Sequence, residues 1–179
     1  MYEENFECNE DLAICLRPLF IGMPDEWIEE ILAISEKVTF KKNEYILKEG
    51  EQNNNIYIII KGHADVLIKR YEDEKTNRII AIDSSPTMYN LYIGDFIGEI
   101  SIIDLEPASA SVLVTSEEME CIKLPIEKLC EILKKNKDMH IMFLINLAKI
   151  IARRLRYTNK LLSKYFYLEN YIKEKEVKD

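Results

Sequence analysis

The sequence has no apolar run long enough to cross a membrane. Its longest hydrophobic stretch, residues 141–148, is interrupted by Asn146 and followed by Lys149, whereas a membrane-spanning helix needs about 20 predominantly apolar residues. The first ten residues carry four acids and no base, which is the wrong charge for a secretory signal peptide. We therefore expect a cytoplasmic protein with no membrane partner.

The sequence is also poor in the patterns that build metal sites and catalytic centres. Its four cysteines include no CxxC pair, and its two histidines, His63 and His140, lie far apart in the chain. Zinc ligands usually recur at short, regular spacings, and Ser–His–acid catalysis would require distant segments to converge without a nucleophile-elbow motif. We expect free thiols, no metal, no catalytic residues and no enzymatic activity.

Basic residues are outnumbered, and the net charge is −8. This charge argues against broad nucleic-acid binding, because such affinity comes largely from cations that neutralise phosphates. The charge is unevenly distributed: residues 1–36 hold ten acids against Arg17, whereas residues 137–164 hold seven bases against Asp138. We interpret the basic segment as the solvated face of a helix.

The chain contains enough residues for one domain, and its hydrophobic period changes along its length. Residues 24–36 place apolar side chains at helical spacing, residues 38–124 consist of short β-rich runs separated by turns, and the helical period returns after Pro125. We predict a mainly β fold, a double-stranded β-helix or jelly-roll-like β-roll, with flanking helices. The expected organisation is an N-terminal segment (1–18), the β-roll with its helices (19–136), a long C-terminal helix (137–175) and a tail (176–179).

The long helix carries a second hydrophobic pattern, in which residues alternate at spacings of four and three as in the seam of a coiled coil. A helix of this length extends about 57 Å, farther than a domain this small. We predict a homodimer formed through this seam, with its one polar residue biasing register or oligomeric state. The alternative is that this face packs on the chain's own β-roll. The seam residues are Leu144, Ala148, Ile151, Leu155, Thr158, Leu162 and Tyr165.

The most informative stretch is residues 94–112, GDFIGEISIIDLEPASASV. It resembles the phosphate-binding cassette of cyclic nucleotide-binding domains, most closely that of the sensor domain of catabolite-activator (Crp/Fnr-type) regulators. Residues 47–69 match the family's Glu-Gly turn and paired strands, and residues 147–156 match a flanking helix. The resemblance implies a regulatory signalling module that binds cAMP, cGMP or another small anionic ligand and transmits through its C-terminal helix.

The cassette offers a physical basis for binding such a ligand. A short helix beginning near residues 97–99 would direct free backbone N–H groups at an anion. Gly98 would allow close approach, and the Glu99 carboxylate would accept hydrogen bonds from a ribose hydroxyl; its alternative role is only that of an acid at a helix start. We expect Pro107 to end this helix, after which period-2 alternation places Ser109 and Ser111 on the pocket side.

On the long helix, the resemblance places two polar residues against the base of the ligand; their alternative role is to specify helix pairing. The predicted ligand-binding residues are Ile97, Gly98, Glu99, Ile100, Ala108, Ser109, Ala110, Thr158 and Asn159.

Ala108 stands where the family pattern has an arginine for the cyclic phosphate. A bidentate charged hydrogen bond is worth about 1.5–3 kcal/mol, so its absence would weaken nucleotide binding by roughly one to two powers of ten. No adjacent base in the cassette plainly replaces it, and Lys75 and Arg78 in the preceding connection are weak candidates. The alternative function is therefore a ligand-independent dimerisation or protein-interaction module with a degenerate pocket.

Catabolite-activator-type regulators continue into a helix-turn-helix domain, but this sequence ends at Asp179. We expect no direct DNA binding by this chain and an output through an unidentified partner protein or through the dimer interface. A lesser alternative is a transcription regulator truncated before its DNA-binding domain. No cofactor is predicted beyond cAMP or cGMP as a ligand.

Overall fold

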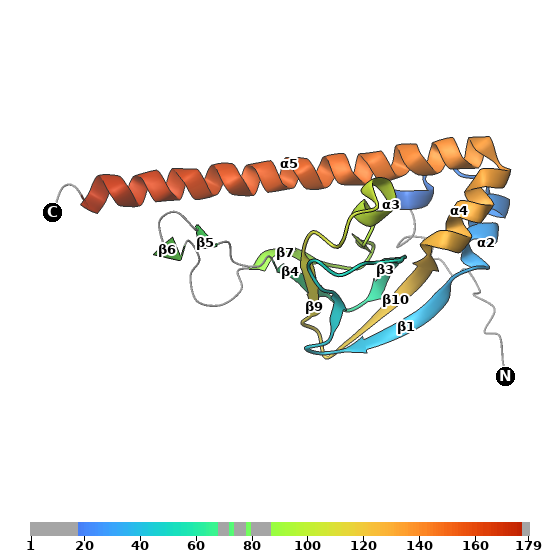
Figure 1. Cartoon of the computed structure of the whole chain (residues 1–179), viewed down its shortest axis with the longest axis horizontal. Helices are drawn as coiled ribbons and strands as arrows, with labels where there is room; N and C mark the ends of the chain where they lie inside the picture. The colour runs from blue at the N-terminus through green and yellow to red at the C-terminus, as the bar shows by residue number, and fades with distance from the viewer. Residues whose placement is uncertain (1–17, 68–71, 74–77, 80–86, 177–179) are drawn as a thin grey trace.

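The computed structural model of the chain describes residues 18–67, 72–73, 78–79 and 87–176, in which a β-roll lies beneath one long helix (Figure 1). Among the described helices, none contains an apolar stretch of membrane-spanning length. In chain order the elements are α2 (Asp25–Leu32), β1 (Glu36–Lys41), β2 (Tyr45–Leu47), β3 (Asn55–Lys61), β4 (Ala64–Leu67), β5 (Glu72–Asp73), β6 (Arg78–Ile79), β7 (Thr87–Leu91), β8 (Phe96–Ile97), α3 (Ile100–Asp104), β9 (Ser111–Val114), β10 (Glu118–Pro125), α4 (Ile126–Lys135) and α5 (Lys137–Glu176).

The roll consists of two four-stranded antiparallel sheets, with strand orders β1-β10-β3-β8 and β2-β9-β4-β7. Apolar side chains alternate along these strands, as expected where one face of each sheet packs on a core. Ile59 and Cys121 from the first sheet meet Val66 and Val112 from the second in one buried cluster. The predicted mainly β roll with flanking helices and a long C-terminal helix is confirmed.

The helices cover the other face of the first sheet. Ile58 and Ile122 belong to a second buried cluster together with Leu129 of α4 and Phe143 of α5. Asn146, the polar residue that interrupts the hydrophobic run of α5, is 1% exposed and donates hydrogen bonds of 2.9 Å to the carbonyl oxygens of residues 19 and 21. These bonds fix the N-terminal half of α5 against the domain.

The helix α5 is 40 residues long, about 60 Å, and its C-terminal end lies far from the two four-stranded sheets (Figure 1). Its buried face carries Met139, Phe143, Leu147 and Ile150, which are spaced for one side of a helix. Most residues of the predicted seam lie on a different, exposed face.

The exposed fractions of the seam residues Leu144, Leu155 and Leu162 are 44%, 60% and 50%. Ala148 is also exposed, whereas Ile151 packs against the second buried cluster and Thr158 is half-buried. The side chain of Tyr165 lies outside the described part. The chain's own β-roll therefore leaves most of the seam uncovered.

Two local expectations need correction. The cassette helix ends at Asp104 rather than at Pro107, because Leu105 takes a left-handed conformation with φ +59° and turns the chain. Ser111 is not among the pocket-lining residues: its Oγ accepts a 3.0 Å hydrogen bond from the backbone N–H of Glu49. Lys75 lies outside the described residues, as does the side chain of Arg78.

Candidate functional site: a small pocket at the cassette

The turn between β8 and α3 requires a glycine. Gly98 has φ +85°, and a Cβ there would collide with the Asn53 side chain and lie 2.6 Å from the carbonyl oxygen of Asn55. Asn53 is buried, and its amide donates a 2.7 Å hydrogen bond to that same carbonyl. The close approach expected of Gly98 is therefore made by the chain's own Asn53–Asn55 turn.

The turn and the strand after α3 enclose an inner pocket with a volume of about 50 Å³. Binding sites for small organic ligands usually occupy roughly 300–1,000 Å³, so this pocket has room for only a few water molecules. The inner pocket is lined by Leu47, Val66, Tyr89, Leu91, Phe96, Ile97, Gly98, Glu99, Ile100, Ser101, Ala108, Ser109, Ala110, Val112 and Arg154.

The structure brings together seven of the nine predicted ligand-binding residues, those of the cassette and the following strand. Thr158 and Asn159 do not line the inner pocket; Thr158 is half-buried and Asn159 is exposed. Both follow Arg154 by about one helical turn, beyond the last contact of α5 with the pocket. Ala108 is 5% exposed, and its backbone N–H and C=O bond to Glu51 and Gly50 at 2.9 and 2.8 Å.

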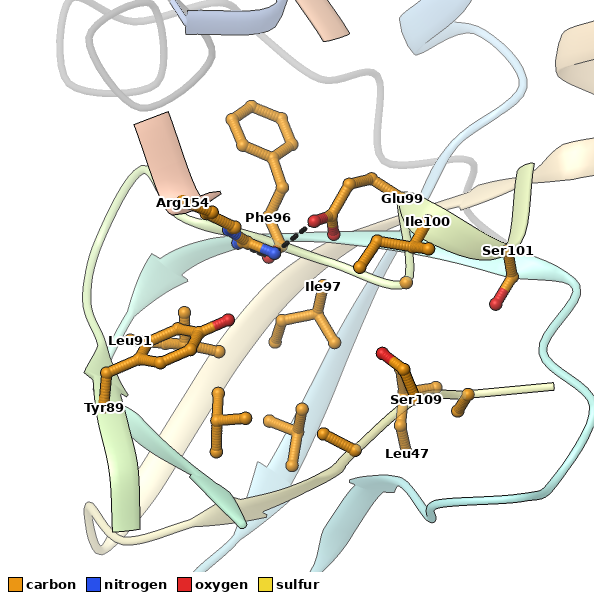
Figure 2. Close-up of a pocket in the computed structure, with 15 residues that line it drawn as sticks. Leu47, Tyr89, Leu91, Phe96, Ile97, Glu99, Ile100, Ser101, Ser109 and Arg154 are labelled. Atoms are coloured by element: carbon orange, nitrogen blue, oxygen red, sulfur yellow. Dashed lines mark hydrogen bonds and ion pairs between the residues drawn. The ribbon is translucent and has the colours of Figure 1, made fainter. Parts of the chain in front are cut away.

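Arg154 of α5 enters the inner pocket, although it is not among the predicted ligand-binding residues. Arg154 donates one hydrogen bond to the carboxylate of Glu99 and another to the carbonyl oxygen of Phe96. The side chain of Glu99 is 2% exposed and that of Arg154 is 21% exposed. Figure 2 shows Arg154 reaching toward Glu99, with Ser109 and Leu47 on the opposite side of the pocket.

The hydrophobic period of α5 indicates that Arg154 lies on the buried face of the helix. Arg154 follows Phe143, Leu147 and Ile150 at spacings of four, three and four, so it belongs to the buried face of α5 rather than to the seam. Charge alone groups it with the other bases of residues 137–164, which are expected to form a solvated face. A basic residue on a buried helical face needs a partner, and the nearest buried acid in the cassette is Glu99.

Tyr89 of β7 forms the wall of the inner pocket beside Arg154 (Figure 2). Its ring meets that of Tyr157 from α5 edge-on, with the centroids 6.1 Å apart and the planes at 81°. Burial raises the pKa of the Tyr89 phenol, and the nearby Arg154 guanidinium partly offsets that rise. Tyr89 is therefore a neutral, largely apolar part of the wall at ordinary pH.

An outer groove of about 390 Å³ lies between α5 and the turn from β7 to β8. It shares Tyr89, Leu91, Phe96 and Arg154 with the inner pocket, so these side chains separate the two spaces. The remaining residues that line the outer groove are Pro18, Asn90, Tyr92, Gly94, Asp95, Ile150, Arg153 and Tyr157.

Comparison with curated proteins returns regulators and kinases. The cAMP-activated global transcriptional regulator CRP of Salmonella typhimurium is 24% identical over 153 residues, which cover 84% of this chain and 66% of the regulator. This chain thus spans just under two thirds of that relative's length. Human cGMP-dependent protein kinase 2 is 23% identical over 109 residues, or 61% of this chain and 13% of the kinase.

Solved structures share the fold. A cyclic nucleotide-binding domain from Methylobacillus flagellatus gives a TM-score of 0.73 at 20% identity and covers 87% of this chain and 83% of its own. The Thermus thermophilus catabolite activator protein gives 0.64 at 21% identity, covering 84% and 63%. The regulatory subunit of a cAMP-independent protein kinase A from Trypanosoma cruzi, bound to guanosine, gives 0.54 at 23% identity, covering 69% and 41%.

The family profile described as "Cyclic nucleotide-binding domain" matches residues 37–136, which include the whole cassette and both sheets up to α4. This match covers more than half of the chain and agrees with the resemblance seen in the cassette. The chain belongs to the cyclic nucleotide-binding domain family.

Proposed function

We propose that the chain is a regulatory sensor in which a small ligand bound beside Glu99 displaces Arg154 and thereby changes the contact of α5 with the β-roll. The observation that carries this proposal is the Arg154–Glu99 ion pair, which joins the cassette to the long helix. Because the inner pocket holds only about 50 Å³, a ligand of nucleoside size has to replace protein side chains there. The ligand binds the arrangement in which Arg154 has left Glu99 more tightly than the paired arrangement. This difference in affinity sets how far the equilibrium between the two positions of α5 shifts.

The chemistry of the pocket favours a ribose-bearing ligand with little phosphate charge. The Glu99 carboxylate accepts hydrogen bonds from ribose hydroxyls once Arg154 leaves it, and Ser109 adds a hydroxyl on the opposite side. At Ala108, where the family pattern has a phosphate-binding arginine, the wall is apolar. A nucleoside therefore fits better than cAMP or cGMP, and the trypanosomal relative bound to guanosine supports this choice.

The sensor transmits its signal through α5. The exposed seam residues Leu144, Leu155 and Leu162 support a homodimer through this helix, because burying apolar side chains is favourable. Ligand-dependent movement of α5 would then reach a partner protein through the dimer. A cytoplasmic location, the absence of direct DNA contact and the absence of enzymatic activity are part of the same proposal.

Calorimetric titration of the full chain with guanosine, adenosine, cAMP and cGMP tests the proposal. We expect a nucleoside to release or absorb measurable heat at lower concentration than either cyclic nucleotide. The variant Ala108→Arg should tighten cAMP or cGMP binding by roughly one to two powers of ten and leave nucleoside binding nearly unchanged. No heat from any of the four ligands up to millimolar concentration would overturn the sensor proposal.

A second candidate function is a ligand-independent dimerisation module. The small volume of the inner pocket, about 50 Å³, favours it, because a ligand of nucleoside size does not fit there without displacing side chains. This candidate predicts no binding heat and the same dimer with or without nucleosides. The titration therefore separates the two functions.

A further inference from the structure

Five basic residues of α5 lie along one face of the helix. They follow one another at spacings of four, three, four and four, which at about 100° per residue places them within roughly 80° of arc. All five are exposed, and among the described residues none forms an ion pair. These residues, which we name the basic stripe, are Lys149, Arg153, Arg156, Lys160 and Lys164.

The basic stripe borders the outer groove and faces away from the dimer seam. Arg153 belongs to the stripe and also lines the groove. Leu155 of the seam is two residues from Arg153, or about 200° around the helix. A homodimer through the seam would therefore leave both the stripe and the groove free.

The groove combines cationic, aromatic and apolar groups. Tyr92 and Tyr157 on its rim are 58% and 50% exposed, whereas Phe96 and Ile150 at its floor are buried. Such a surface suits a peptide segment that carries acidic and apolar side chains together, since the apolar ones can enter the groove while the acids meet the stripe. The net charge of −8 disfavours a nucleic acid as the partner.

The chain itself contains a segment of this composition. Residues 1–17 include five acids and one base, together with apolar residues such as Phe6, Leu12 and Leu16. They join the domain at Pro18, which lines the outer groove. Seventeen residues can reach up to about 60 Å when extended, whereas the basic stripe is about 22 Å long. A covalent tether of this kind gives an effective concentration in the millimolar range.

We propose that residues 1–17 bind the outer groove and the basic stripe of their own chain. Three independent observations support this occupant: the opposite charges of the two segments, the apolar floor of the groove, and the attachment point at its rim. The binding is largely electrostatic on the stripe, because the five cations are exposed there. It should therefore weaken at 1 M salt, where the screening length is about 3 Å.

Zero-length carbodiimide cross-linking of the full chain, read by mass spectrometry, tests the proposal, since this reagent joins only carboxylates and amines in contact. We expect cross-links within one chain from the acids of residues 3–11 to Lys149, Lys160 or Lys164, and a several-fold lower yield at high salt. The matched controls are Lys134 and Lys135, exposed lysines of α4, which should not react with this segment.

A charge variant and a mixed-isotope sample complete the test. Arg153→Glu combined with Arg156→Glu should lower the yield several-fold while the circular dichroism spectrum stays that of the wild type. Equal cross-linking to the α4 lysines, or none to the stripe, would overturn the proposal. So would cross-links found only between isotopically distinct chains, or tight binding of a DNA duplex that the charge variant loses.

Discussion

Arg154 and Glu99 form an ion pair across 55 positions of the chain, and their side chains are 21% and 2% exposed. Glu99 belongs to the cassette and Arg154 to the long helix, so one contact joins the pocket to the element that extends beyond it. An ion pair removed from water is sensitive to the loss of either partner, because the remaining charge is left without compensation. In the proposed sensor, this pair is therefore the place where a ligand and α5 would influence each other.

The variants Glu99→Gln and Arg154→Met, made singly and together, measure that coupling. Loss of one partner of a buried pair costs about 3–5 kcal/mol; because Arg154 is partly exposed, we expect each single variant to lose about 2–3 kcal/mol of unfolding free energy. The double variant should lose clearly less than the sum of the two. Urea unfolding of all four proteins gives the values, and losses that add to within about 0.5 kcal/mol would contradict the coupling.

Gly98 should be far less tolerant of a side chain than Gly50. Both have positive φ, +85° and +83°, but a Cβ at Gly50 meets nothing within 4 Å, whereas one at Gly98 collides with Asn53. We expect Gly50→Ala to cost about 1 kcal/mol of strain and Gly98→Ala about 1–3 kcal/mol more. Thermal unfolding compares the two variants directly. Equal losses of unfolding free energy would show that the Asn53–Asn55 turn can move away from the new Cβ without destabilising the fold.

The proposed homodimer predicts that Leu155→Lys converts the pair to monomers. The side chain is 60% exposed in the single chain, so lysine there changes monomer stability by no more than about 0.5 kcal/mol but places two like charges in the seam of a pair. Sedimentation velocity measures the mass. Ile21→Lys, an exposed apolar position outside α5, serves as the control and should stay dimeric. If Leu155→Lys remains a dimer, the copies do not meet through this seam.

Cys121 should make the fold sensitive to alkali. Burial raises the pKa of this thiol from 9.0 to about 12. The unfolded chain therefore releases its proton near pH 9 while the native chain still holds it, so the unfolding free energy falls as the pH rises above 9. Between pH 9 and 10.5 the loss due to this thiol is about 2 kcal/mol.

Denaturant unfolding at each pH tests this dependence. Cys121→Ala should flatten the alkaline fall relative to the wild type, whereas Cys130→Ala, at a half-buried position, should leave it in place. An identical alkaline slope in the wild type and in Cys121→Ala would show that other groups control it.

The β-roll and the long helix could be predicted because they depend on patterns local in the sequence. The structure shows alternating buried side chains along β3 and β9, and it shows the long helix α5 where the helical period follows Pro125. The cassette residues were also predictable, since a contiguous stretch of sequence supplies Gly98, Glu99 and Ser109 to one pocket.

The rest of the site depends on contacts between distant segments. Arg154 enters the pocket because the buried face of α5 lies beside Glu99 in the folded chain. No local pattern in the sequence shows that these two residues are close in space. The requirement for Gly98 comes from the Asn53–Asn55 turn, 43–45 residues earlier, rather than from a ligand. The wall of the small pocket likewise combines distant segments, since Tyr89 of β7 and Arg154 of α5 both line it.

Hydrogen–deuterium exchange of the full chain, with and without saturating guanosine, adenosine, cAMP or cGMP, tests the central claim most directly. The sensor proposal predicts that at least one of these ligands slows exchange in residues 96–105 of the cassette and speeds it in residues 150–158 of α5, because Arg154 leaves Glu99. Unchanged exchange with all four ligands, or protection of the cassette with no change in α5, would contradict it.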